Sequence, residues 1–180
     1  MLMTAAFSLP PHFQEFLEHW RSFRPSAHGA PQPGLPRLSD FLDKPSPRFA
    51  PWLTISDVDD PILHRVRLIG TGVVDFFNYD STGSNFLVGV TNGLLETFRR
   101  CHYEVPRRPC GKFQKSICST SAGRERAILG MALPLIRADG GLSVMWFLNV
   151  GESPDPGEIG AQITRLTGEY WIDLGNGVPD

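Results

Sequence analysis

Residues 127–150 read AILGMALPLIRADGGLSVMWFLNV, two apolar runs separated by Asp139-Gly140-Gly141. An aspartate followed by glycine between two apolar runs indicates a tight turn, so this stretch predicts a β-hairpin. Side chains alternate between the two faces of a strand, and both faces of the second strand carry large apolar residues. These are Leu142, Val144, Trp146 and Leu148 on one face, and Met145 and Phe147 on the other. Both faces must therefore be covered, and a space left under one cover would be a place for a ligand.

The composition of the whole chain is that of an ordinary globular protein. It has 180 residues, 41% of them hydrophobic and 20% charged, with a formal net charge of -2. We expect one domain with appendages rather than a disordered or fibrous chain. The three cysteines show no CxxC spacing, which is typical of reduced thiols and predicts a cytoplasmic location. No stretch resembles a signal peptide or a membrane span, so we expect no membrane association.

The N-terminal part, residues 1–49, is predicted to be a helix followed by a proline-rich connector. Apolar residues recur at helical spacing between Pro11 and Arg24, which predicts an amphipathic helix. We expect its aromatic stripe to pack on the sheet or to build a homodimer. Residues 25–51 contain seven prolines and predict an extended connector with one short helical turn near residues 38–42.

The central part, residues 50–150, has the pattern of a mixed α+β domain. An acidic turn separates two predicted strands, residues 75–83 suit a short helix or loop over the sheet, and a longer helix follows, capped by Thr91 or Asn92. Pro134 lies inside a predicted strand, which favours an edge position or a bulge there. The predicted strands span residues 52–58, 64–74, 111–120, 125–137 and 142–150.

This order of elements resembles a PAS sensory domain over roughly residues 50–150. The chain is more narrowly similar to the bacterial single-domain PAS proteins found mainly in alphaproteobacteria, through short motifs in matching order. The motifs are the helix with Phe16, Leu17 and Trp20, then Ile69-Gly70-Thr71-Gly72-Val73, Tyr79-Asp80-Ser81-Thr82-Gly83, Leu133-Pro134-Leu135 and Asp139-Gly140.

The resemblance implies an α+β fold with a five-stranded antiparallel sheet and helices on one face. It implies that the N-terminal helix packs on the other face of the sheet or in a dimer. The function it implies is a small sensory or protein-interaction module in bacterial signalling, which binds a small ligand, a partner protein or both. No kinase, cyclase or DNA-binding domain follows Val150, so any output must pass through a partner protein.

Aromatic residues in the central part are our candidates for the lining of a ligand pocket. A domain of this size also needs a core, and we consider plain packing the stronger interpretation of the same residues. The candidates are Phe76, Phe77, Tyr79, Phe86 and Phe98, with Trp146 or Phe147 opposite them.

The sequence does not identify a cofactor, a metal site or an active site. Histidine is a common haem ligand, and His64 and His102 are the candidates, although we favour surface positions for both. The cysteine segment of photoactive flavin-binding PAS domains is missing. The chain also lacks a nucleophile beside a base, a zinc-type spacing and a glycine-rich phosphate loop, so we do not expect an enzyme.

An alternative function uses the basic segment 99–115, which could bind an anion or a nucleotide. Clustered arginines with interleaved aromatics make phosphate and stacking contacts. We favour a solvated loop and a charge-protected edge strand, and we do not expect a nucleic-acid partner. The candidate anion-binding residues are Arg99, Arg100, Arg107 and Arg108.

The tail, residues 151–180, is predicted to form a short amphipathic helix. Ile159, Ile163 and Leu166 have helical spacing, and Gly168 would end the helix. Several large apolar residues follow, and they should pack on the domain or on a partner because so many are not expected to lie in solvent. They are Tyr170, Trp171, Ile172 and Leu174.

Overall fold

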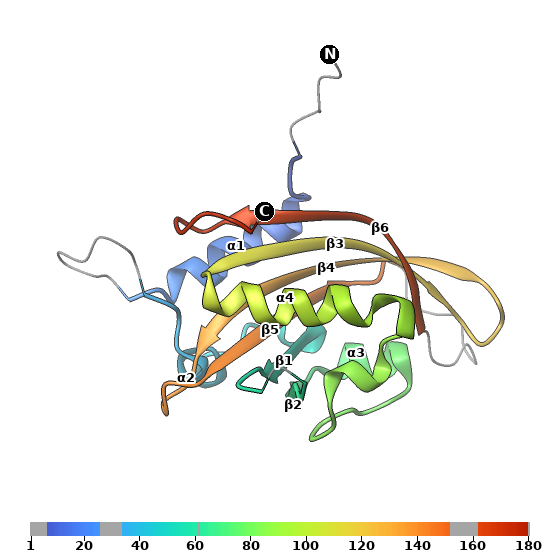
Figure 1. Ribbon diagram of the computed structural model, residues 1–180, viewed down its shortest axis with the longest axis horizontal. Coiled ribbons are helices and arrows are strands. Elements are labelled where there is room, and N and C mark those ends of the chain that lie inside the picture. Colours follow the sequence, from blue (N-terminus) through green and yellow to red (C-terminus); the bar gives the residue numbers. More distant parts are fainter. Residues whose placement is uncertain (1–6, 26–33, 61, 152–161, 180) are drawn as a thin grey trace, which may run out of the picture.

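The computed structural model describes residues 7–25, 34–60, 62–151 and 162–179. Its centre is an antiparallel sheet of six strands in the order β2-β1-β5-β4-β3-β6 (Figure 1). The protein is therefore α+β, with one strand more than the five predicted. The strands are β1 (Leu53–Asp57), β2 (Arg65–Ile69), β3 (Cys110–Ser119), β4 (Glu125–Ile136), β5 (Leu142–Asn149) and β6 (Gln162–Asp173).

Helices lie on both faces of this sheet. Helices α1 and α2 cover one face, while α3 and α4 lie over the other (Figure 1). The α-helices are α1 (Pro11–Ser22), α2 (Leu38–Asp43), α3 (Thr71–Phe77) and α4 (Leu95–Arg107), and the short 3₁₀ helices are η1 (Ala50–Trp52), η2 (Phe86–Gly89) and η3 (Asn92–Leu94).

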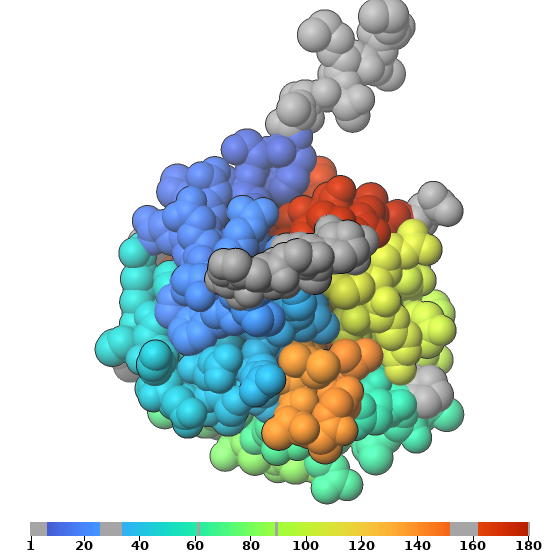
Figure 2. Space-filling view, turned by 90° about the vertical axis from the view of Figure 1, so that its left-hand side faces the viewer, coloured from blue at the N-terminus to red at the C-terminus, as the bar shows by residue number. Residues whose placement is uncertain are grey.

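The aromatic stripe of α1 is buried against the sheet of its own chain. Phe13 and Phe16 pack on Phe147 of β5, with ring centroids 5.3 and 4.5 Å apart. The indole N–H of Trp20 donates to the carbonyl of Pro134 across 2.9 Å. In Figure 2 the N-terminal segments, blue to cyan, lie against the orange β4–β5 hairpin and near the red β6. The aromatic stripe is therefore no longer an argument for a homodimer, which stays a prediction.

The opposite face of the sheet packs on α4. Phe98, Cys101 and Val105 of this helix share a buried cluster with Val144 and Trp146 of β5. On the other face, Met145 and Phe147 belong to the cluster that contains α1. The two-sided alternation predicted for this strand is thus present, and each face has its own helical cover.

The second predicted strand is shorter than expected, because β2 ends at Ile69 and α3 begins at Thr71. Gly70 explains the change of direction. A Cβ atom at this position would lie 2.3 Å from the carbonyl oxygen of Pro51, so the chain can pass η1 only without a side chain. The prediction of a strand through residue 74 is wrong for this reason.

The predicted tail helix is also wrong, because residues 162–173 form β6. This strand pairs with β3 from Ser119↔Gln162 to Cys110↔Asp173. Ile163 and Leu166 have helical spacing, but the segment is also rich in β-branched and aromatic residues, and pairing with β3 decides between the two. Ile159 lies outside the described residues. As predicted, the apolar end of the tail packs on the domain, with Leu174 buried in the α1 cluster.

Pro134 lies in an internal strand rather than at an edge, and its position explains why it is tolerated. The pairing of β4 with β3 reaches only to Lys112↔Ala132, so Pro134 lies beyond the paired part. Its carbonyl points to Trp20, and the N–H that proline lacks would point to the same side. No bond to β3 or β5 is therefore lost.

Candidate functional site

A cavity of about 640 Å³ lies between the sheet and the segments that contain α3, η2 and α4. This volume is in the range of small-molecule sites. Its walls are largely apolar, with contributions from both helices and from β5. The apolar lining includes Val73, Phe86, Phe98, Ile128, Trp146 and Leu148.

The polar part of the cavity wall is neutral. Among the described residues that line the cavity there is no Asp, Glu, Lys, Arg or His. Thr54, Gln114 and Ser116 are buried polar side chains on three positions of the sheet floor. Gln114 is only 1% exposed, and within the described part of the chain its Oε1 has no hydrogen-bond partner. Buried polar atoms are nearly always paired, so this oxygen is a candidate contact for a bound molecule.

A glycine in β4 lets two side chains of β5 pack closely over the sheet floor. Gly130 pairs with Gln114 on one side and with Leu148 on the other. A Cβ atom there would lie 3.2 Å from Leu148 and 3.4 Å from the Trp146 ring, tighter than ordinary packing. Leu148 and Trp146 therefore occupy the space over Gly130, beside the Gln114 side chain.

The structure brings most of the predicted pocket aromatics together. Phe77, Tyr79, Phe86, Phe98 and Trp146 line the cavity. Phe76 does not, because it is buried in a separate cluster with Cys118 and Ile128. Phe147, the alternative to Trp146, faces α1.

Sequence reasoning missed the polar lining. Gln114 and Ser116 lie in an internal strand, paired with β4 and β6, and Gly130 interrupts the apolar pattern of β4. A polar residue or a glycine inside a strand that is covered on both sides is the signal that could have indicated these positions.

Two buried histidines lie next to the cavity wall, which overturns the surface positions expected for them. His64 and His102 are almost inaccessible to solvent, and their Nδ1 atoms are 2.7 Å apart. The indole N–H of Trp146, a cavity residue, donates to Nε2 of His102 across 2.8 Å. The two histidines are 38 residues apart, and no local sequence pattern predicts that they pair.

This chain of contacts fixes the protons of both rings. Tryptophan can only donate, so Nε2 of His102 must accept, and the proton of a neutral His102 sits on Nδ1. That proton is donated to Nδ1 of His64, which leaves the proton of His64 on Nε2. Burial, and next the neighbouring His64, hold the pKa of His102 well below its ordinary value. Both nitrogens of His102 are therefore engaged, which does not fit a haem ligand.

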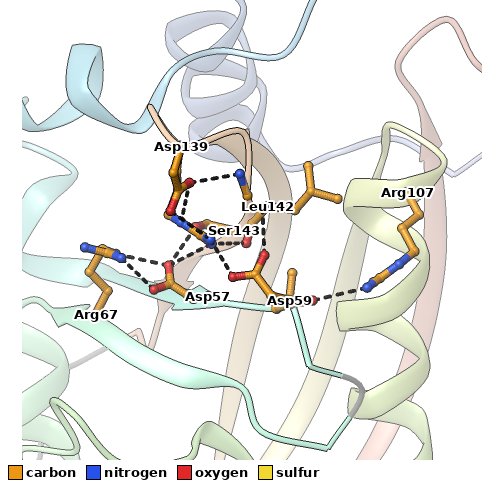
Figure 3. Close-up of polar contacts among 10 residues, drawn as sticks. Asp57, Asp59, Arg67, Arg107, Asp139, Leu142 and Ser143 are labelled. Atoms are coloured by element: carbon orange, nitrogen blue, oxygen red, sulfur yellow. Dashed lines mark hydrogen bonds and ion pairs between the residues drawn. The ribbon is translucent and has the colours of Figure 1, made fainter.

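The largest polar network joins the β4–β5 hairpin to β1 and β2 (Figure 3). Arg137, with a side chain only 10% exposed, forms ion pairs with Asp57, Asp59 and Asp139. Arg67 contacts both carboxylate oxygens of Asp57, at 3.0 and 2.7 Å. Burial raises the pKa of Asp57, but hydrogen bonds from Arg67 and Ser143 and the charge of Arg137 outweigh it and lower this pKa overall. The network joins the hairpin to β1 and β2, and none of these residues belongs to the cavity lining.

The four arginines predicted to bind an anion each have a contact within the chain. Arg99 pairs with Glu96 at 3.4 Å, and the Arg100 guanidinium lies 5.9 Å from the Trp171 ring centroid. Arg107 donates to the Tyr103 and Val58 carbonyls, and Arg108 to that of Val178.

The basic segment is not a loop followed by an edge strand, as the sequence suggested. It is formed by α4 and by β3, which pairs on both sides.

The cysteines and the carboxylates do not form a metal centre in the described residues, where no cluster of three or more His, Cys, Asp or Glu side chains occurs. Cys101, Cys110 and Cys118 are all buried. Burial raises the pKa of the Cys110 thiol to about 11 and that of Cys101 still further, so neither is a thiolate at neutral pH.

A scan against protein-family models, a search of curated proteins and a search of solved structures each found no match to this chain. In the described ranges, no helix has the length and apolar character needed to cross a membrane.

Proposed function

We propose that this protein is a PAS-like sensory module that binds a small molecule in the cavity beside α3 and α4 and passes the signal to a partner protein. The observation that carries the proposal is a cavity of about 640 Å³, lined by Gln114, whose buried amide oxygen has no partner among the described residues. The PAS resemblance rests on an order of elements, and the structure has the same order: β1, β2, α3, α4, β3, β4, β5.

The walls of the cavity suggest how binding could be passed on. Val73 and Phe77 belong to α3, and Phe98 belongs to α4, so a ligand would touch both helices. A molecule that fills the cavity would favour one arrangement of these helices over others. We expect the partner protein to contact their outer surface.

The first experiment is native mass spectrometry of the purified protein, compared with its mass after denaturation. We expect an additional small-molecule mass in the native spectrum, or stabilisation in a thermal-shift screen of neutral small molecules. Ser116→Leu, which fills the cavity, should abolish either signal. Ser39→Leu is the matched control, because Ser39 is exposed in α2. Failure of the natural sequence in both measurements would refute the proposal.

The alternative, an anion-binding module that uses segment 99–115, has less support because its arginines already have contacts within the chain. It predicts salt-sensitive binding of an anion such as a nucleotide, lost in Arg107→Ala/Arg108→Ala. Unchanged affinity in this double variant would rule it out.

A further inference from the structure

We infer that the ligand is an uncharged, mainly apolar molecule with one N–H or O–H group that donates a hydrogen bond to Oε1 of Gln114. The inference rests on the proposed function and specifies the class of ligand. It depends on three features of the cavity: a neutral lining, a buried acceptor without a partner, and apolar walls on both sides.

The lining offers no opposite charge to an ionic ligand, although several Ser and Thr hydroxyls belong to it. Removing an ion from water is costly unless an opposite charge or several hydrogen bonds replace the solvent. Lys112 is a cation on the same face of β3, two residues from Gln114. Its amine is 2.9 Å from Glu169 and 4.3 Å from the Trp171 ring centroid. Glu169 of β6 thus pairs with the charge of Lys112, which is not available to an anion in the cavity.

The Gln114 amide defines the polar contact. This residue lies in the interior of the sheet, between β4 and β6. Its Oε1 has no donor among the described residues, and Gln114 belongs to the lining of the cavity. A ligand N–H or O–H at this position would satisfy the oxygen that the fold leaves unpaired.

The body of the ligand would lie against aromatic walls. The rings of Phe98 and Trp146 have centroids 5.7 Å apart, and Phe86 lies 5.9 Å from Phe98. All three line the cavity. Apolar surface of this kind favours a hydrophobic, ring-containing molecule with few polar atoms.

Three probes of almost equal shape test this inference by isothermal titration calorimetry on the full chain. 2-Naphthol is neutral and donates a hydrogen bond, 2-methoxynaphthalene is neutral without a donor, and 2-naphthoate is an anion. We expect 2-naphthol to bind most tightly, 2-methoxynaphthalene about tenfold more weakly, and 2-naphthoate about 100-fold more weakly or not at all.

Gln114→Met removes the acceptor and keeps the length of the side chain. We expect it to bind 2-naphthol about tenfold more weakly and 2-methoxynaphthalene with unchanged affinity. The matched control is Ser56→Ala, because Ser56 Oγ is also buried without a partner in the described residues but does not line the cavity. This control should bind all three probes like the natural sequence.

The inference is overturned if 2-naphthoate binds as tightly as 2-naphthol, or if Gln114→Met leaves the preference for 2-naphthol unchanged. Strong 2-naphthoate binding that Ser116→Leu abolishes would refute the inference and leave the proposed function intact. If no probe binds, no small-molecule mass appears in the native spectrum and the thermal-shift screen finds no stabilisation, both fail.

Discussion

The two faces of the sheet are built differently. On the α1 face, aromatic and aliphatic side chains from α1, α2 and four strands form one continuous buried cluster. On the α4 face, the core is divided into two smaller clusters, and a cavity, a histidine pair and an unpaired amide oxygen lie there. The α1 face also borders a smaller hollow of about 410 Å³ beside α2 and the β1–β2 edge. The α4 face differs because it combines the larger space with buried polar groups, which cost stability.

This difference suggests a division of roles within one sheet. Close packing on one face can supply the stability that hollow space on the other face reduces. Unsatisfied groups and cavities in a stable protein are concentrated where function requires them. The predictions below test whether the two faces really differ in this way.

The largest effect is expected from truncation of an aromatic residue on the α1 face. Phe16 is fully buried between Phe49 and Phe147, so Phe16→Ala should lower the free energy of unfolding by about 3–5 kcal/mol. Phe86 lines the cavity and is only partly buried, so Phe86→Ala should cost roughly half as much or less. Urea unfolding of both variants measures the difference, and equal losses would show that the two faces are packed alike.

Enlarging a side chain should also affect the two faces differently, with the larger loss of stability again on the α1 face. Leu133 is buried in the α1 cluster, where Leu133→Phe should destabilise the protein by about 1–3 kcal/mol through overpacking. Ser116→Leu places its extra carbon atoms in the cavity, and we expect a change in stability within about 1 kcal/mol. Thermal unfolding of the two variants provides the comparison. A large loss for Ser116→Leu would mean that the space is not available to an added group.

The histidine pair should make the α4 face sensitive to acid. The folded-state pKa of His102 lies below its ordinary value of 6.5, so the unfolded chain takes up the proton first. The contribution of neutral His102 to the free energy of unfolding is complete above pH 6.5. Below this pH it decreases, by at most about 1.4 kcal/mol for each pH unit. Urea unfolding at pH 7.5, 6 and 5 should show this loss.

His102→Gln provides the control for this pH dependence. A glutamine amide can still accept from Trp146 and donate toward His64, but it does not titrate in this range. We expect the free energy of unfolding to depend less steeply on pH in this variant. Part of the dependence should remain, because burial also lowers the pKa of His19. The carboxylates with lowered pKa values titrate below pH 4 and do not contribute in this window. An identical slope in His102→Gln would contradict the assignment.

The main features of the fold could be predicted from local patterns in the sequence. Two such patterns are the alternation in residues 142–148 and the helical spacing of Phe13, Phe16 and Trp20. They predict the face on which each side chain is buried, because burial follows the period of the element. The end of β2 and the strand β6 could not be predicted in this way. The first depends on contact between Gly70 and Pro51, and the second on pairing with β3, and both are tertiary effects.

The candidate site was predictable only in its apolar part. Aromatic residues in the central segment mark a core or a pocket by composition alone, and most of them do line the cavity. The isolation of the Gln114 oxygen and the pairing of His64 with His102 depend on which residues lie opposite each other in space. No local pattern contains that information.

The position of the Arg137 network has a consequence for the rate of ligand exchange. β4 is 12 residues long, so the network beside its C-terminal end lies about 40 Å from the turn at its N-terminal end. Cavity residues at the β3–β4 turn and the start of β6, such as Ser121 and Gln162, are exposed there. The ion pair at this end, Arg165 with Glu125, is more than half exposed, whereas Arg137 is nearly buried. A ligand would therefore enter and leave at this more weakly held end. The residence time would then follow local opening of one turn and one strand end, and it could be tuned without changing the stability of the whole fold.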